Sequence, residues 1–138
     1  AAIAGALREI AAHRPVIFAV HPRTTQRLNA AGISLGNVRM LPPVRYIEML
    51  DLVDGAFAVV TDSGGLQEET TALGIPCFTV RENTERPVTI TEGTNRLVPN
   101  PEDLPGAVRA AERPAHPTRP EGWDGRAGER VIAALRDR

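Results

Sequence analysis

Short apolar runs alternate with helix-forming stretches along most of this chain. The apolar runs, each with the length of a buried strand, cover residues 16–20, 38–41, 56–60, 77–80 and 95–98. The helical patterns cover residues 1–13, 24–31, 46–54, the stretch that stops at Gly74, 101–112 and 125–136. Strands and helices in alternation, with short connections, build a parallel sheet covered on both faces. The sequence therefore predicts one α/β domain over residues 1–138.

Charge and composition exclude several classes of partner. A net charge of −1 gives no basic field for nucleic acid or an anionic membrane surface. No apolar run approaches the roughly 20 residues of a membrane span, and the charged first ten residues do not resemble a signal peptide. The single cysteine, Cys77, excludes an internal disulfide, and no residues have the spacing of a zinc site. We expect a cytoplasmic protein with no metal, cofactor, nucleic acid or membrane partner.

Residues 61–69, Thr-Asp-Ser-Gly-Gly-Leu-Gln-Glu-Glu, carry the strongest functional signal. They join an expected strand to an expected helix, and the two glycines let a ligand approach the backbone. The free N–H groups and the dipole of the helix's first turn attract an anion. Ser63 can cap the helix or bind a phosphate oxygen, and Glu69, one turn along, can reach an attached sugar. This pattern predicts a nucleotide diphosphate site; the alternative is an ordinary helix cap and tight turn.

Three polar segments follow expected strands and should share one sheet edge. They are His21-Pro22-Arg23, residues 62–65 and residues 81–86. Ligands bind at the carboxyl ends of parallel strands, and the planar fork of arginine suits phosphate. Pro87 suits the first position of a helix, so a second helix should begin near the anion. Taken singly, a histidine such as His21 is more often a structural hydrogen-bonding residue, and residues 81–86 could form a salt-bridged loop.

Six sequence blocks carry a family resemblance. In order they are His21-Pro22-Arg23, residues 61–69, Leu73-Gly74-Ile75-Pro76-Cys77, residues 81–87, residues 93–98 and Trp123-Asp124-Gly125. Together they resemble the C-terminal half of the non-hydrolysing UDP-N-acetylglucosamine 2-epimerases, over nearly the whole chain. The resemblance implies a Rossmann-like domain, one half of a GT-B-type two-domain fold. It also implies an isomerase of cell-envelope polysaccharide biosynthesis, which interconverts UDP-GlcNAc and UDP-ManNAc by elimination and re-addition of UDP.

The resemblance implies roles for the residues around the diphosphate. The backbone of Ser63, Gly64 and Gly65 would hold the diphosphate. His21 and Arg86 would be the catalytic residues, because cations and donors at a leaving diphosphate stabilise its developing charge. Arg23 would bind UDP beside His21.

The same resemblance implies a nucleoside pocket and a set of partners. Glu69 would bind the ribose, and Tyr46 and Met49 would shape the pocket for the base. The partners would be UDP and UDP-N-acetylhexosamine, with a homodimeric parent protein. No cofactor or metal is implied.

The chain departs from the family in length and in one local pattern. Family members are more than twice as long, and the N-terminal domain with its proton-transferring carboxylates has no counterpart here. The first strand of the nucleotide-binding domain is also expected to be missing. Because the proton-transferring carboxylates have no counterpart, the chain should bind UDP without epimerising it. Pro43 stands where glycine or an acidic residue is common. A hydrolysing relative that releases ManNAc, a GT-B glycosyltransferase fragment and a non-catalytic nucleotide-binding module remain as alternatives, although residues 84–87 disfavour the glycosyltransferase.

Overall fold

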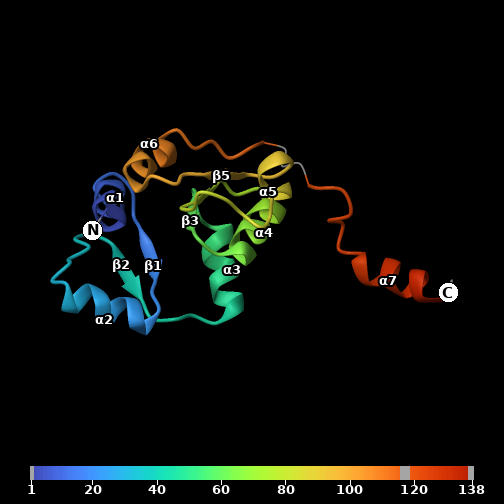
Figure 1. The fold of residues 1–138 in the computed structure, drawn as a ribbon, viewed down its shortest axis with the longest axis horizontal. Helices are drawn as coiled ribbons and strands as arrows, with labels where there is room; N and C mark the ends of the chain where they lie inside the picture. The colour runs from blue at the N-terminus through green and yellow to red at the C-terminus, as the bar shows by residue number, and fades with distance from the viewer. Residues whose placement is uncertain (1, 116–118, 137–138) are drawn as a thin grey trace.

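The computed structural model describes residues 2–115 and 119–136 and confirms the alternation of strands and helices (Figure 1). The strands are β1 (Ile17–Ala19), β2 (Arg39–Leu41), β3 (Val59–Thr61), β4 (Cys77–Thr79) and β5 (Asn95–Leu97). The helices are α1 (Ala2–Ala11), α2 (Pro22–Ala30), α3 (Tyr46–Asp54), α4 (Gly64–Leu73), α5 (Val88–Thr91), the 3-10 helix η1 (Pro101–Asp103), α6 (Leu104–Arg109) and α7 (Ala127–Arg136).

In the described part of the chain all strand pairings are parallel, as predicted, and the strands are divided between two sheets. β1 pairs with β2, with Ile17 opposite Arg39. β4 is the central strand of the second sheet, between β3 and β5. Within the described residues no ladder joins β1 to β3, so the order is interrupted between them.

The two faces of β4 are covered by different helices. Phe78 packs into an apolar cluster with α1 and α6, which includes Ile10 and Leu104. Successive strand residues point to opposite faces, so Cys77 and Thr79 face α4. Cys77 is fully buried, and burial raises the pKa of its thiol, which confirms it as a core residue of the strand. Helices therefore lie on both faces of this sheet.

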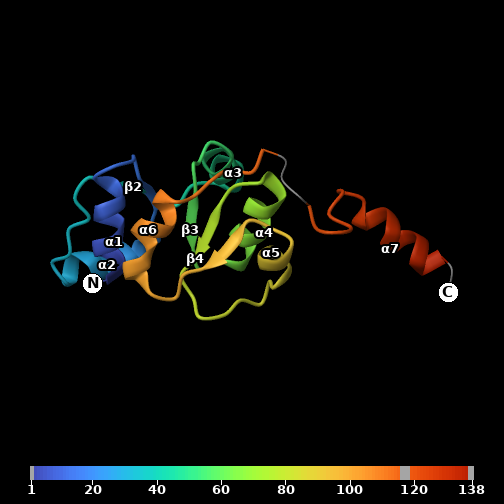
Figure 2. The ribbon, with the colours of Figure 1, turned by 90° about the horizontal axis from the view of Figure 1, so that it is seen from above.

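Helix α1 contributes to both apolar clusters found among the described residues. Ala6 and Ile10 belong to the cluster around Phe78. Ala4, near the start of the same helix, packs with Leu35 and Val38 under the first sheet. Figure 2 shows α1 beside α6 with both sheets close by. The first helix thus joins two sheets that share no strand pairing.

The C-terminal segment leaves the body of the domain. The predicted surface excursion, residues 113–128, begins where Arg113 Nη1 donates to the carbonyl of Asp54 at 3.4 Å; residues 116–118 lie outside the described part. Figures 1 and 2 show α7 standing apart from the two sheets, and all its residues are exposed. No helix in the described part of the chain is long and apolar enough to cross a membrane.

Candidate functional site

The turn between β3 and α4 forms the expected helix start. Ser63 is the N-cap residue with extended backbone angles (φ −86°, ψ 126°), and its N–H donates to Thr61 Oγ1 at 3.0 Å. Its side chain makes no capping hydrogen bond, so the hydroxyl is not committed to the helix. Gly64 and Gly65 begin α4, and the N–H groups of a first turn have no partner within the helix. The arrangement offers several donors at the positive end of the helix dipole.

The loop after β4 lies over this helix start. Thr61 and Thr79 are opposite each other in the ladder, so the segments that follow β3 and β4 emerge side by side. A Cβ atom added to Gly64 would lie 2.7 Å from Glu85 Oε1 and 3.7 Å from Arg86 Cγ. The close approach at Gly64 is therefore made by a carboxylate of the loop itself, which sequence analysis did not foresee.

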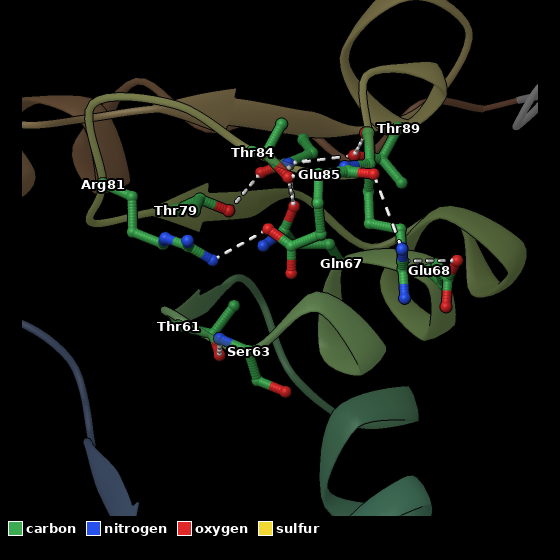
Figure 3. A network of polar contacts seen from close by, with 11 residues as sticks. Thr61, Ser63, Gln67, Glu68, Thr79, Arg81, Thr84, Glu85 and Thr89 are labelled. Atoms are coloured by element: carbon green, nitrogen blue, oxygen red, sulfur yellow. Dashed lines mark hydrogen bonds and ion pairs between the residues drawn. The ribbon is translucent and has the colours of Figure 1, made fainter.

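Both arginines of this loop are paired with carboxylates, and Figure 3 shows the pair of Arg81 and Glu85. Arg81 Nη1 lies 2.9 Å from Glu85 Oε2, and Arg86 Nε lies 2.8 Å from Glu68 Oε1. The second contact is an ion pair without hydrogen-bond alignment, since Arg86 Nε has no hydrogen-bond partner. The backbone N–H of Glu85, followed by the charges of Arg81 and Arg86, lowers the pKa of Glu85. Partly exposed pairs of this kind are weak, so an incoming anion can displace the carboxylates.

Two buried polar residues with no predicted role lie behind the loop. Gln67 of α4 is fully buried, and Asn95 of β5 is 5% exposed. Gln67 Oε1 accepts hydrogen bonds from Thr84 Oγ1 at 2.5 Å and from Asn95 Nδ2 at 3.1 Å. The sequence signal for this pair is a polar residue at a core-facing position of a helix and another at such a position of a strand. Because buried polar groups need partners, two such residues are expected to bond to each other or to their neighbours.

A short helix follows the loop, as Pro87 predicts. α5 begins directly after this proline, which is its N-cap residue. Thr89, in the first turn of α5, is fully buried and donates through its hydroxyl to the carbonyl of Arg86 at 2.7 Å. The helix thus fixes the far end of residues 81–86, the arginine loop.

The predicted nucleoside residues lie at a groove between α3 and α4. The groove encloses about 460 Å³ and is lined by Tyr46, Ile47, Leu50, Asp51, Asp54, Glu69, Ala72 and Leu73. The negative charge of Glu69, and a hydrogen bond to it, raise the pKa of the Tyr46 phenol. The structure therefore brings Tyr46 and Glu69 together. Met49 is half-buried on α3 and is not among the residues lining this groove.

His21 and Arg23 follow β1, which is a strand of the other sheet. His21 follows β1 and caps α2, its Nδ1 accepting from the N–H of Arg23 at 3.2 Å. This is the structural role considered for His21, and it leaves Nε2 as the ring nitrogen available to a ligand. Within residues 2–115 and 119–136, neither side chain is bonded to α4 or to the arginine loop. The structure thus brings two of the three predicted segments together, and the third follows a strand of the separate β1–β2 sheet.

No metal site accompanies these groups in the described part of the chain. There, no three His, Cys, Asp or Glu side chains gather closely enough to hold an ion. The site itself presents helix N–H groups, arginines and carboxylates.

Comparison with known proteins identifies the relatives of this chain. The model of one protein family, described as UDP-N-acetylglucosamine 2-epimerase, matches residues 1–136. The chain belongs to the UDP-N-acetylglucosamine 2-epimerase family. The UDP-N-acetylglucosamine 2-epimerase of Methanocaldococcus jannaschii is 38% identical over an alignment of 128 residues, and the alignment covers 88% of this chain and 35% of that protein. The UDP-2,3-diacetamido-2,3-dideoxy-D-glucuronate 2-epimerase of Pseudomonas aeruginosa is 40% identical over 103 residues, 74% of this chain and 29% of that protein.

The fold is that of part of an epimerase of this family. The crystal structure of the M. jannaschii UDP-GlcNAc 2-epimerase, in complex with UDP-GlcNAc and UDP, matches with a TM-score of 0.81 and 36% sequence identity. The match covers 99% of this chain and 40% of that chain. The chain therefore spans well under half the length of its epimerase relatives.

Proposed function

We propose that this chain is the C-terminal, UDP-binding part of a UDP-GlcNAc 2-epimerase that interconverts UDP-GlcNAc and UDP-ManNAc. The observation that carries the proposal is the glycine-bearing start of α4 beneath an arginine loop, in a chain of the epimerase family. The M. jannaschii relative was solved with UDP-GlcNAc and UDP bound, which supports a uridine nucleotide as the ligand. The break in strand order between β1 and β3 supports the view that a strand outside these 138 residues completes the domain.

In this proposal the diphosphate binds at the first turn of α4. The N–H groups of Gly64 and Gly65 and the Ser63 hydroxyl donate to phosphate oxygens, and Arg86 exchanges Glu68 for the phosphate. Arg86 and His21 then act on UDP as it leaves, because donors and cations placed at a developing anion lower the barrier. Holding UDP in place makes its re-addition a step within one complex.

The nucleoside extends from the diphosphate toward the groove between α3 and α4. Glu69 accepts hydrogen bonds from the ribose hydroxyls, and Tyr46, which lines the groove, contacts the base. Arg23, in the first turn of α2 after His21, adds a cation to the site. Proton transfer at C2 of the sugar is assigned to the part of the protein that these residues do not include.

A calorimetric titration of this chain with UDP tests the proposal. We expect saturable binding that Arg86→Ala weakens about tenfold or more, the effect of one charge-assisted hydrogen bond. Arg109→Ala is the matched control, because Arg109 is also paired with a glutamate (3.5 Å from Glu9) but lies on α6. A chain shown to be folded by circular dichroism that does not bind UDP would contradict the proposal.

A second substrate is favoured by the Pseudomonas aeruginosa relative, which is a UDP-2,3-diacetamido-2,3-dideoxy-D-glucuronate 2-epimerase. If residues outside this chain recognise the sugar, UDP and UDP-GlcNAc should bind these 138 residues with similar affinity. Incubating the full-length protein with each sugar nucleotide, and following its conversion by NMR, identifies the substrate. Free ManNAc in the UDP-GlcNAc reaction would indicate the hydrolysing alternative.

A further inference from the structure

The backbone of Arg86 is held on both sides by threonine hydroxyl groups. Its N–H donates to Thr84 Oγ1 at 3.0 Å, and its carbonyl accepts from Thr89 Oγ1 at 2.7 Å. Each hydroxyl has a second partner in the core. Thr84 Oγ1 donates to Gln67 Oε1 at 2.5 Å, and Thr89 Oγ1 accepts from Asn95 Nδ2 at 3.0 Å (Figure 3).

Asn95 closes these contacts into a ring. Its amide nitrogen has two hydrogens and donates to both Gln67 Oε1, at 3.1 Å, and Thr89 Oγ1. Its Oδ1 accepts from Thr79 Oγ1 at 2.7 Å, which fixes the orientation of the amide. The hydrogen-bonded ring therefore consists of Arg86, Thr84, Gln67, Asn95 and Thr89.

The ring fixes the orientation of the Gln67 side chain but leaves the amide nitrogen of Gln67 without a partner. Gln67 Oε1 accepts two hydrogen bonds in the ring, while its Nε2 is buried without a hydrogen-bond partner. A buried donor left unpaired is destabilising. Stability alone does not explain such an arrangement, whereas fixing the position of the loop does.

We propose that Asn95 is a positioning residue, which holds Arg86 over the first turn of α4 through the hydrogen-bonded ring. The inference rests on the proposed function, in which the guanidinium of Arg86 binds the diphosphate. With its backbone fixed, Arg86 has only side-chain torsions left to order when the anion arrives, so less affinity is lost to conformational entropy. Asn95 itself lies in β5, behind the loop, and acts through the backbone of Arg86.

Amide hydrogen exchange tests the ring without any ligand. Asn95→Leu removes both donors, and we expect exchange at the Arg86 amide to accelerate more than exchange at core amides of β4. Thr70→Val is the matched control, because Thr70 is also buried but its hydroxyl donates to the Leu66 carbonyl of its own helix at 2.7 Å. Arg86 exchange that changes only in step with the core would overturn the proposal.

Thr84 provides a milder pair of variants in case Asn95→Leu does not fold. Thr84→Ser keeps the hydroxyl and should retain protection of the Arg86 amide. Thr84→Val removes the hydroxyl and should lose that protection, although its volume is nearly unchanged. Equal protection in the two variants would show that the ring does not hold Arg86.

Titration with UDP then separates positioning from stability. In the folded Asn95→Leu or Thr84→Val chain, affinity should fall about tenfold, close to the effect of Arg86→Ala. The double variants with Arg86→Ala should bind no more weakly than Arg86→Ala alone, because the ring acts through that residue. Additive losses would contradict the proposal. If the unsubstituted chain does not bind UDP, the proposed function fails, and hydrogen exchange still decides whether Asn95 positions Arg86.

Discussion

Gly64 and Gly93 both lie against neighbouring atoms, but those atoms differ in how far they can move. A Cβ atom on Gly64 would meet the carboxylate of Glu85, the far end of a flexible side chain, at 2.7 Å. A Cβ atom on Gly93 would lie 2.5 Å from both the backbone carbonyl oxygen of Thr89 and Thr71 Oγ1. Only at Gly93 would the added Cβ atom meet a backbone atom, which cannot swing aside. We therefore expect Gly64 to tolerate a methyl group better than Gly93 does.

Gly93→Ala should destabilise the chain strongly, and Gly64→Ala should not. We expect Gly93→Ala to lower the free energy of unfolding by about 1–3 kcal/mol or more, as overpacking does. Gly64→Ala should change it by less than about 1 kcal/mol, because alanine is the better helix former and Glu85 can swing aside. Urea unfolding of both variants measures the difference. Similar losses in the two variants would show that the Glu85 side chain is not free to move.

At the scale of single elements, α3 depends on one carboxylate for its start. Glu48 Oε2 accepts from the backbone N–H of Arg45 at 2.9 Å, and Glu48 Oε1 accepts from the Arg45 side chain. The backbone hydrogen bond, followed by the side-chain one, lowers the pKa of Glu48 from its ordinary value of 4.5. The first turn of α3 also carries Tyr46 and Met49, so the cap orders two predicted nucleoside residues.

Glu48→Ala should therefore lower the thermal midpoint and loosen the start of α3. Glu48→Gln is the matched control, because glutamine can still accept the backbone hydrogen bond. A lowered carboxyl pKa adds stability above pH 4.5, and this is lost as the pH falls through the lowered value. The difference between the unsubstituted chain and Glu48→Gln should thus be present at neutral pH and vanish in acid. A difference that persists in acid would mean that the charge of Glu48 is not its source.

Local patterns predicted the elements better than the contacts between them. The helix over residues 46–54 has its predicted bounds, because its periodicity and the glycine after it are local features. The helix over residues 101–112 is divided into η1 and α6 and ends at Arg109. Likewise, the start of α4 is as predicted, whereas the pairing of Gln67 with Asn95, 28 residues apart, was not. Such pairings depend on strand register and on which face of a strand is covered, which local spacing does not contain.

Across the whole molecule, α1 is the element that joins the two sheets. Ile10 is 9% exposed in the cluster around Phe78, and Ala4 of the same helix belongs to the cluster of Leu35 and Val38. No strand ladder connects the sheets in the part of the chain that the structure describes. Packing on α1 therefore couples them.

Ile10→Ala should destabilise both sheets together. We expect a loss of about 2–5 kcal/mol, the usual effect of truncating a buried isoleucine. Ile3→Ala is the control on the same helix, since Ile3 is 47% exposed. Hydrogen exchange in the Ile10→Ala chain should accelerate in β1–β2 as well as in β3–β5. Acceleration confined to β3–β5 would show that the sheets unfold independently.

The position of α1 also sets the order in which the chain can fold during synthesis. Paired strands are close in sequence, 22 residues apart for Ile17 and Arg39 and 18 for Cys77 and Asn95, so each ladder can form soon after its second strand appears. Helix α1 instead packs against η1 and α6, and 89 residues separate Ala11 from Pro101. Contacts this distant along the chain form late, and apolar surface left uncovered in the meantime favours aggregation. A nascent chain arrested before residue 101 would therefore present the Ile10 face of α1 to chaperones and proteases.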